Sequence, residues 1–100
     1  MLFINPAAEK FGGFVSRYVP VGIPVGIGFI CAYMEKHDLR CRVLDEEVET
    51  ITADRVREAL AGMPKPHVIG IGCLTAHVAR AYQIAQMIKA EIPDTIITVG

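Results

Sequence analysis

The sequence predicts an α/β domain in which helices cover a parallel sheet of four strands. Short apolar runs typical of buried strands occur four times along the chain. A segment with apolar residues at helical spacing lies between each of these runs and the next. At 100 residues and 52% hydrophobic content, the chain can form one domain with an ample core. Residues 1–100 are therefore expected to be a single domain with the order β-α-β-α-β-α-β.

The N-terminal part contains the first expected strand and helix. Met1–Asn5 is an apolar run that Pro6 ends. Pro6–Ile23 has no sustained period, and its aromatic residues fit either a lid over a ligand or a surface packed on another domain. A buried helix is expected from Pro24, which suits a first helical turn, to the charged residues 35–38. Its apolar stripe comprises Ile23, Ile27, Ile30, Cys31 and Met34.

The middle of the chain predicts an edge strand and a second helix. Arg40–Asp45 alternates before it becomes apolar, which is typical of a strand with one partly wet face. Thr52–Gly62 is expected to be a helix with Thr52 as N-cap and Gly62 near its end. The stripe of this helix comprises Val56, Ala59, Leu60 and Met63.

The C-terminal part holds the expected central strand. His67–Gly72 reads as a strand buried on both faces, and Thr75 is a plausible cap for the helix that follows. Pro93 ends this helix, and Thr95–Val99 is the fourth strand. The apolar line of the third helix runs through Val78, Ala81, Ala85, Ile88 and Ile92.

Right-handed crossovers give this topology a consequence. With strand order 2-1-3-4, the first helix lies alone on one face, and the other two lie on the opposite face. Part of strands three and four is then bare, so we expect an exposed apolar patch and self-association of the isolated chain. Because the chain stops directly after a strand, it is expected to be a fragment truncated before a fifth strand.

Composition argues against several classes of function. The net charge is −1 with no basic run, so a nucleic-acid surface is not expected. No signal peptide is evident, and the uncharged stretch 18–34 contains prolines and glycines that disfavour a membrane span. Three cysteines at wide spacings suggest neither a zinc site nor a disulfide framework. We therefore expect reduced thiols in a cytoplasmic protein.

The carboxyl edge of the central strand is where an open α/β sheet places its ligand. Two G-x-G segments, at Gly26 and Gly70, lack the third glycine of a dinucleotide fingerprint and fit close packing better. His77 and the acidic cluster after Asp45 fall at this edge, where either ligand contact or simple solvation explains them. No nucleophile–base pair or metal-ligand spacing is present, so neither catalytic residues nor a metal site are expected.

Five segments in register resemble the N-terminal cobalamin-binding domain of radical-SAM enzymes, the group that includes anaerobic magnesium-protoporphyrin IX monomethyl ester oxidative cyclase. They are Leu2–Pro6, Pro24–His37, Val43–Asp45, Val68–Thr75 and Ile96–Gly100. The resemblance implies a flavodoxin-like (Rossmann-like) three-layer fold, with cobalamin across the carboxyl edge and its nucleotide tail beside the central strand. The cofactor-binding residues it implies are Asn5, Pro6, Gly26, Asp45, Gly72, Cys73, Leu74, Thr75 and Gly100.

Two departures from related cobalamin carriers shape this expectation. Gly72-Cys73-Leu74 takes the place of the family's S-x-L segment, which removes a hydroxyl that would hydrogen-bond the tail. The D-x-H-x-x-G motif that supplies a lower cobalt ligand is absent, as in many radical-SAM relatives. The C-x-x-x-C-x-x-C motif is absent as well, so S-adenosylmethionine and the [4Fe–4S] cluster would belong to a downstream radical-SAM domain. The rival interpretation is a receiver-like or nucleotide-binding flavodoxin-like domain without a corrinoid.

Overall fold

Four parallel strands form the sheet, in the spatial order β2-β1-β3-β4. The computed structural model describes residues 1–8 and 24–100, so the prediction of a lid or packing surface over Pro6–Ile23 lies mainly outside the described residues. The strands are β1 (Leu2–Asn5), β2 (Arg42–Asp45), β3 (Val68–Ile71) and β4 (Ile96–Val99). The helices are α1 (Val25–Lys36), α2 (Ala53–Leu60) and α3 (Val78–Glu91), with a 3₁₀ turn, η2 (Thr75–His77), before α3. The fold class and strand order are as predicted.

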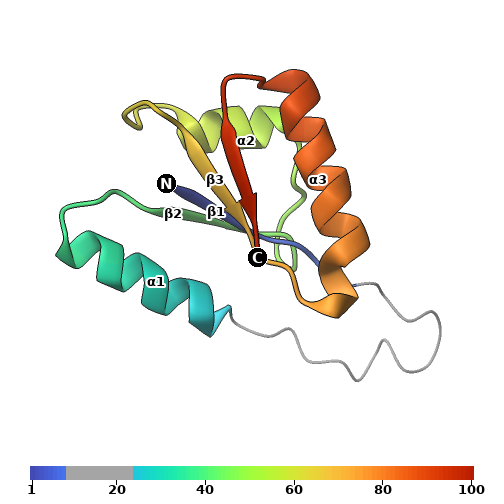
Figure 1. Ribbon diagram of the computed structural model, residues 1–100, viewed down its shortest axis with the longest axis horizontal. Coiled ribbons are helices and arrows are strands. Elements are labelled where there is room, and N and C mark those ends of the chain that lie inside the picture. Colours follow the sequence, from blue (N-terminus) through green and yellow to red (C-terminus); the bar gives the residue numbers. More distant parts are fainter. Residues whose placement is uncertain (9–23) are drawn as a thin grey trace.

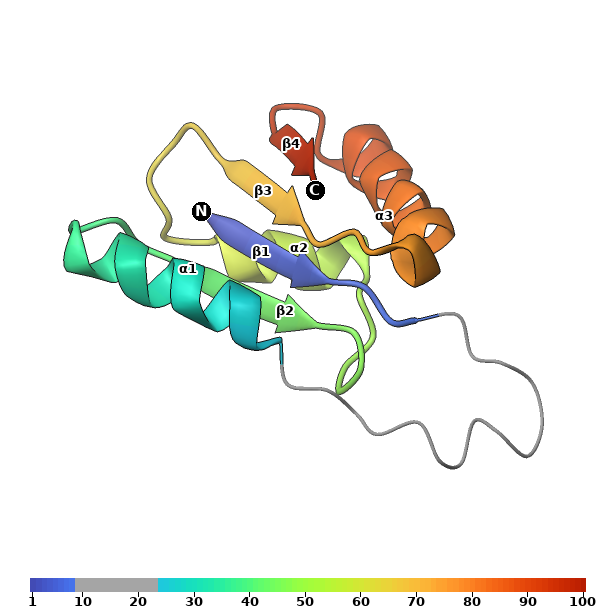
Figure 2. The ribbon, with the colours of Figure 1, turned by 60° about the horizontal axis from the view of Figure 1, so that its bottom comes forward.

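The helices are divided between the two faces of the sheet, as right-handed crossovers require. Figures 1 and 2 show α1 on one side of the sheet, and α2 and α3 on the other side. This gives the three layers of a flavodoxin-like fold. None of the described helices is long and apolar enough to cross a bilayer.

The hydrophobic core lies between the sheet and the α2–α3 layer. Alternate strand residues such as Leu2, Ile4, Ile69 and Ile71 are buried there. Both helices contribute a buried stripe to it. From α2 and the turn after it come Val56, Ala59, Leu60 and Met63, and from α3 come Ala81, Ile84 and Ile88.

Local sequence explains where two of the helices end. Thr52 is the N-cap of α2, since its hydroxyl accepts a hydrogen bond from the Arg55 N–H at 3.2 Å, and Gly62 follows the helix at a φ of 74°. At the end of α1, the N–H groups of Asp38 and Leu39 donate to the carbonyls of Glu35 and Met34, both at 3.0 Å. This is a Schellman turn, with Asp38 in the left-handed position at a φ of 60°.

Three expectations about local structure need correction. Thr75 does not cap α3, because a 3₁₀ turn with no side-chain cap precedes that helix. The outer strands start later than expected, at Arg42 and Ile96, since Arg40 and Thr95 belong to the turns that lead into them. The first helix forms, but no residue of α1 is buried, and its stripe residues Ile27, Cys31 and Met34 are only half-buried.

The expectation of reduced thiols is also wrong. Cys31 of α1 and Cys41, just before β2, form a disulfide with Cα atoms 5.6 Å apart, and Cys73 remains free. The spacing of ten residues gave no sign of this pairing. It arises because the Schellman turn sends the chain back along α1, so that Cys41 returns to Cys31 in the second turn of the helix.

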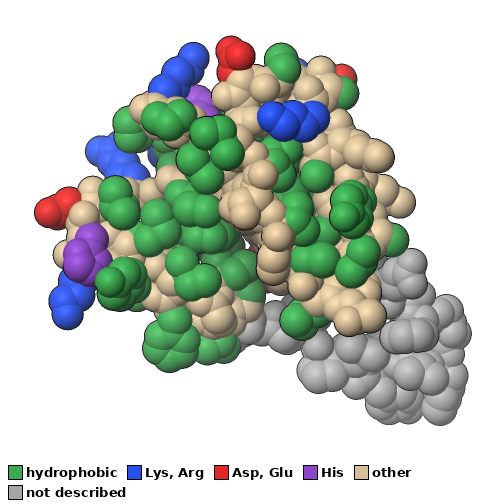
Figure 3. Space-filling view, viewed as in Figure 1, with side chains coloured by type: hydrophobic (Ala, Val, Ile, Leu, Met, Phe, Trp, Pro, Cys, Tyr) green, Lys and Arg blue, Asp and Glu red, His purple; other side chains and the backbone are tan. Residues whose placement is uncertain are grey.

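The expected apolar patch is present on the α1 side. Figure 3 shows hydrophobic side chains gathered over α1 and the adjoining strands, with charged side chains mainly toward the margins. The outer surface of α1 exposes Phe29 and Tyr33, at 73% and 67%, and β4 exposes Ile96 at 54%. Phe29 and Tyr33 lie on the solvent side of α1, and Ile96 is exposed because no second helix of the described part covers the β3–β4 half of this face.

Candidate functional site at the carboxyl edge

The strand register brings four of the predicted residues into one row across the sheet. Asn5 pairs with Asp45, Ile4 pairs with Ile71, and Ile71 pairs with Val99. The next position along each of these strands therefore belongs to the same row at the carboxyl edge. This edge row consists of Asp45, Asn5, Gly72 and Gly100.

The edge row lies on the α1 face of the sheet. A Cβ placed on Gly72 would lie 3.8 Å from Ile27 Cδ1 of α1 and 3.9 Å from Asn5 Oδ1. The neighbouring row on the same face contains Val43, Phe3, Gly70 and Thr98. Small residues thus lie in the β3–β4 half of this face, where none of the described helices covers them, although the Phe3 ring packs over Gly70.

The polar half of the edge row is held by hydrogen bonds within the protein. Asn5 Nδ2 donates to Asp45 Oδ1 at 2.9 Å, and the Glu47 N–H donates to the same oxygen at 3.1 Å. Both side chains of this pair are half-buried. Each therefore retains hydrogen-bonding capacity toward solvent or a ligand.

The glycine half of the edge row is open. Gly100 is exposed, and a Cβ added to it would meet nothing within 4 Å. A side chain at Gly72 would make only ordinary van der Waals contacts, so the missing serine hydroxyl leaves space at that position. Backbone hydrogen bonds keep the two segments together, since the Cys73 N–H donates to the Gly100 carbonyl at 2.9 Å.

The other predicted site residues differ in accessibility. Pro6 is fully buried, so it acts by directing the chain out of β1 rather than by touching a ligand. Gly26 lies in the first turn of α1 with open space around it. Leu74 is 70% exposed, and Thr75 is exposed at the start of η2. The free Cys73 is half-buried between the strand end and these residues.

An ion-paired cluster behind the edge row was not predicted. Glu46 accepts hydrogen bonds from Arg80 Nε of α3 at 2.8 Å and from the Ala7 N–H at 3.0 Å. The Ala8 N–H donates to Glu47 Oε1 at 3.1 Å. Together these contacts fasten the chain after β1 to the β2–α2 turn and to α3.

The charge of Glu46 is stabilised in this cluster. Partial desolvation opposes ionisation, but the Arg80 guanidinium and the Ala7 N–H outweigh it, so the pKa of Glu46 is lowered. The pKa of Arg80 is raised by the same contact, which is consistent with one shared interaction. Opposite charges at the same predicted edge were a signal that sequence reasoning had available and did not use.

Ile27 is a second contact residue that sequence reasoning missed. It was assigned only to the apolar stripe of α1, yet its Cδ1 atom reaches the vicinity of Gly72. The available signal was its position in the first turn of a helix that begins at the carboxyl edge. A stripe residue in the first turn of such a helix must face the strand ends.

Metal-ligating residues are not assembled among the described residues. No group of three or more His, Cys, Asp or Glu side chains converges there. His77 belongs to η2 at the carboxyl edge, whereas His37 and His67 lie at the amino edge. The edge therefore offers space, backbone groups and an Asn–Asp pair for a ligand, but no metal centre.

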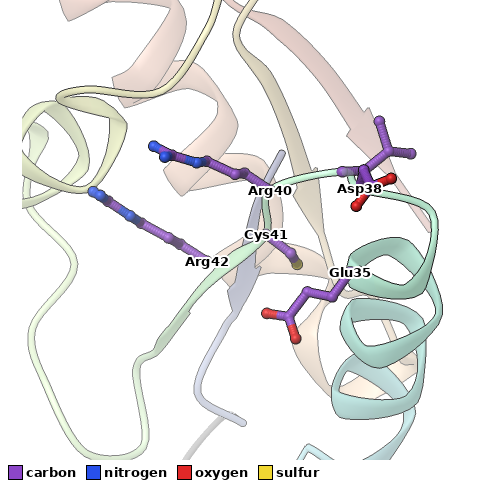
Figure 4. Close-up of a pocket in the computed structure, with 6 residues that line it drawn as sticks. Glu35, Asp38, Arg40, Cys41 and Arg42 are labelled. Carbon is purple, nitrogen blue, oxygen red and sulfur yellow. The ribbon is translucent and has the colours of Figure 1, made fainter.

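Two shallow cavities lined by described residues both lie at the opposite, amino edge. One, of about 470 Å³, lies between the end of α1 and the start of β2. Figure 4 shows that Arg40 and Arg42 extend from it toward α2, away from Glu35. Arg42 Nη1 donates to the Ala59 carbonyl at 2.7 Å, so this arginine serves the C-terminal end of α2.

The second cavity, of about 260 Å³, lies at the C-terminal ends of α2 and α3 and is lined partly by Met63, His67 and Ile92. His67 Nε2 is 3.2 Å from the Met63 carbonyl, a contact within the loop that leads into β3. Neither cavity contains a residue of the edge row. We therefore keep the row as the candidate site on the basis of topology and register.

The fold defines the class of the protein, a flavodoxin-like α/β domain, and the edge row is its candidate ligand site. The B12 binding domain family matches residues 13–100, and the chain belongs to this family. The match covers α1 to β4, and Asn5 and Pro6 lie outside it. No curated protein and no solved structure matches the chain.

The geometry fits a cobalamin. Its nucleotide tail ends in a flat apolar ring system, which needs a strip of small residues that no helix covers. Gly72 and Gly100 of the edge row, together with the exposed Thr98 of β4, provide such a strip among the described residues. The domain is therefore a cobalamin-binding module.

Proposed function

We propose that cobalamin lies across the edge row, with its nucleotide tail over Gly72 and Gly100 and beside Ile27. The observation that carries this placement is the row itself, in which two glycines stand on the half of the sheet that α1 leaves open. Asn5 and Asp45 at the other half offer polar groups to the amide side chains of a corrin ring. Bound cobalamin would supply cobalt chemistry, either electron transfer or methyl transfer.

We further propose that this module serves a radical-SAM enzyme, of the type of magnesium-protoporphyrin IX monomethyl ester oxidative cyclase. The support is the resemblance of five segments in register and the lack of a D-x-H-x-x-G histidine after β1. S-adenosylmethionine and a [4Fe–4S] cluster would then be held by another domain of the parent protein. In this proposal the module positions a cofactor and has no catalytic residue of its own.

Titration with hydroxocobalamin, followed by visible absorbance, tests the placement. Gly100→Phe should abolish or strongly weaken binding without lowering the melting temperature, because a ring at this position has free space in the unliganded protein. Gly28→Phe is the matched control, since it adds the same ring to the exposed surface of α1 away from the edge row. Gly72→Ser should retain or improve binding.

Two outcomes would contradict the proposal. An equal loss of hydroxocobalamin affinity in Gly100→Phe and Gly28→Phe would mean that the cofactor binds elsewhere. Absence of hydroxocobalamin binding, combined with binding of flavin mononucleotide or ATP, would favour the rival nucleotide-binding function. For the enzyme context, the parent protein should reconstitute a [4Fe–4S] cluster and cleave S-adenosylmethionine reductively.

A further inference from the structure

The attachment of α1 to the rest of the domain is unusual among its helices. No residue of α1 is buried, whereas α2 and α3 each bury three. Only the half-buried stripe Ile27, Cys31 and Met34 faces the sheet. Apolar packing therefore holds α1 far less firmly than it holds the other two helices.

A covalent link takes the place of that packing. Cys31 lies in the middle of the α1 stripe, and its disulfide partner Cys41 directly precedes β2. Their Cα separation of 5.6 Å is ordinary for a disulfide. Apart from the chain itself, the disulfide is thus the firmest attachment of α1 among the described residues.

Reagents of small size can reach this link. Both cysteines are half-buried rather than buried, and Cys41 lines the open cavity between α1 and β2. Figure 4 shows the sulfur of Cys41 directed toward the α1 side of that cavity, near Glu35. A low-molecular-weight thiol therefore has access to the pair from solvent.

The link is coupled to the candidate site through one face of the helix. Cys31 follows Ile27 by four residues, so the two side chains lie one turn apart on the same face. Ile27 is the α1 residue whose Cδ1 atom lies beside Gly72 of the edge row. Fixing Cys31 therefore fixes the distance between α1 and the glycine half of the row.

We propose that Cys31 and Cys41 are a redox switch that sets the position of α1 and, through it, the affinity for cobalamin; this second step rests on the proposed function. In the oxidising direction, a low-molecular-weight disulfide of the glutathione class accepts two electrons and two protons from the two thiols. One protein S–S bond forms, the S–S bond of the reagent breaks, and two reagent thiols are released. A reduced dithiol reverses the exchange.

Hydrogen–deuterium exchange tests the structural step without any cofactor. Reduction should raise the free thiols from one to three, and should increase amide exchange in residues 25–36 while β3 and α3 stay unchanged. The variant Cys31→Ser/Cys41→Ser should show the fast exchange under all conditions. Cys73→Ser should keep the redox response. Equal exchange in α1 before and after reduction would overturn the switch.

Hydroxocobalamin titration tests the coupling step. Because reductants attack hydroxocobalamin, the oxidised protein is compared with Cys31→Ser/Cys41→Ser in the absence of reductant. We expect the disulfide form to bind about 5- to 10-fold more tightly, within the usual range of coupling between sites. Equal measurable affinities would overturn the coupling while the structural switch stands. If neither form binds while α1 exchange still responds to reduction, the proposed function fails and the structural switch survives.

Discussion

Substitution of Gly70 by alanine should destabilise the domain through a single contact. Gly70 is the third of the four residues of β3 and pairs in register with Phe3 of β1. A Cβ added to Gly70 would lie 2.9 Å from both Phe3 Cδ1 and Cε1, and 3.1 Å from Met1 Cε. The Phe3 ring thus occupies the space in which a side chain at position 70 would stand. Gly70 is a packing glycine, in agreement with the interpretation that its G-x-G segment serves close packing.

The expected cost follows from how far the ring must move. Methyl and ring carbons are comfortable at about 3.5–4.0 Å, so the contact must lengthen by roughly 0.5–1 Å. The Met1 methyl group can swing away at little cost, but Phe3 is only 8% exposed and belongs to a stiff strand. Overpacking of this kind typically costs about 1–3 kcal/mol. For a chain of this size the loss corresponds to a melting temperature lower by roughly 5–20 °C.

Thermal unfolding followed by circular dichroism measures this effect. Gly28→Ala provides the matched control, because Gly28 lies in α1 with nothing within 4 Å of an added Cβ. That variant should gain about 0.5–1 kcal/mol from helix propensity. A Phe3→Leu background should reduce the cost of Gly70→Ala, since the shorter side chain can yield. The packing argument would be refuted if Gly70→Ala left the melting temperature unchanged. It would also be refuted if the substitution lowered the melting temperature equally in the wild-type and Phe3→Leu backgrounds.

Three other predictions concern ion pairing and helix ends. Glu46 has a lowered pKa in the folded state, so its contribution to stability is full above about pH 4.5 and is lost as pH falls through the lowered value. Glu46→Gln should therefore lower the free energy of unfolding by about 1 kcal/mol at neutral pH, a value that allows for the partial exposure of Arg80. In urea unfolding at a series of pH values, the variant should lose less stability than the wild type as the pH falls below about 4.5. An equal loss in both proteins would contradict this prediction. Asp38→Gly should raise the free energy of unfolding by about 0.5–1 kcal/mol, because glycine adopts the left-handed region without strain. A lower free energy of unfolding in urea would count against the Schellman assignment. Thr52→Ala should lower it by about 1 kcal/mol, whereas Thr52→Ser should retain most of the capping, and equal values for the two variants would contradict a cap at Arg55 N–H.

The fold was largely predictable because each element carries its own periodic signal. The α2 stripe with its Thr52 cap, and the apolar run of β3, specify type and approximate position locally. Right-handed crossovers then leave few ways to order the strands. The edge row follows from the same reasoning, since parallel strands end at one edge and Asn5, Asp45, Gly72 and Gly100 each mark a strand end.

Interactions between distant segments were not predictable in the same way. The Cys31–Cys41 disulfide depends on the direction in which a Schellman turn returns the chain, which sequence spacing does not determine. The contact between Phe3 and Gly70 depends on the register of two strands that are separated by 62 residues in sequence. At Thr75, a 3₁₀ turn competes with the cap that local preference suggests, and three-dimensional context decides the outcome.

The two faces of the sheet are buried to different extents. As a result, stability and ligand contact depend mainly on different residues, although many proteins combine both in the same residues. Stability resides in the layer between the sheet and α2–α3, together with the Glu46–Arg80 pair. The α1 face carries the candidate site, and α1 itself contributes no buried residue to stability. Substitutions at the open positions of this face, such as Gly100, can therefore alter ligand preference at small thermodynamic cost, whereas Gly70 is held by its contact with Phe3. A lineage that retains the α2–α3 layer is free to adapt its α1 face to different corrinoids or different partner domains.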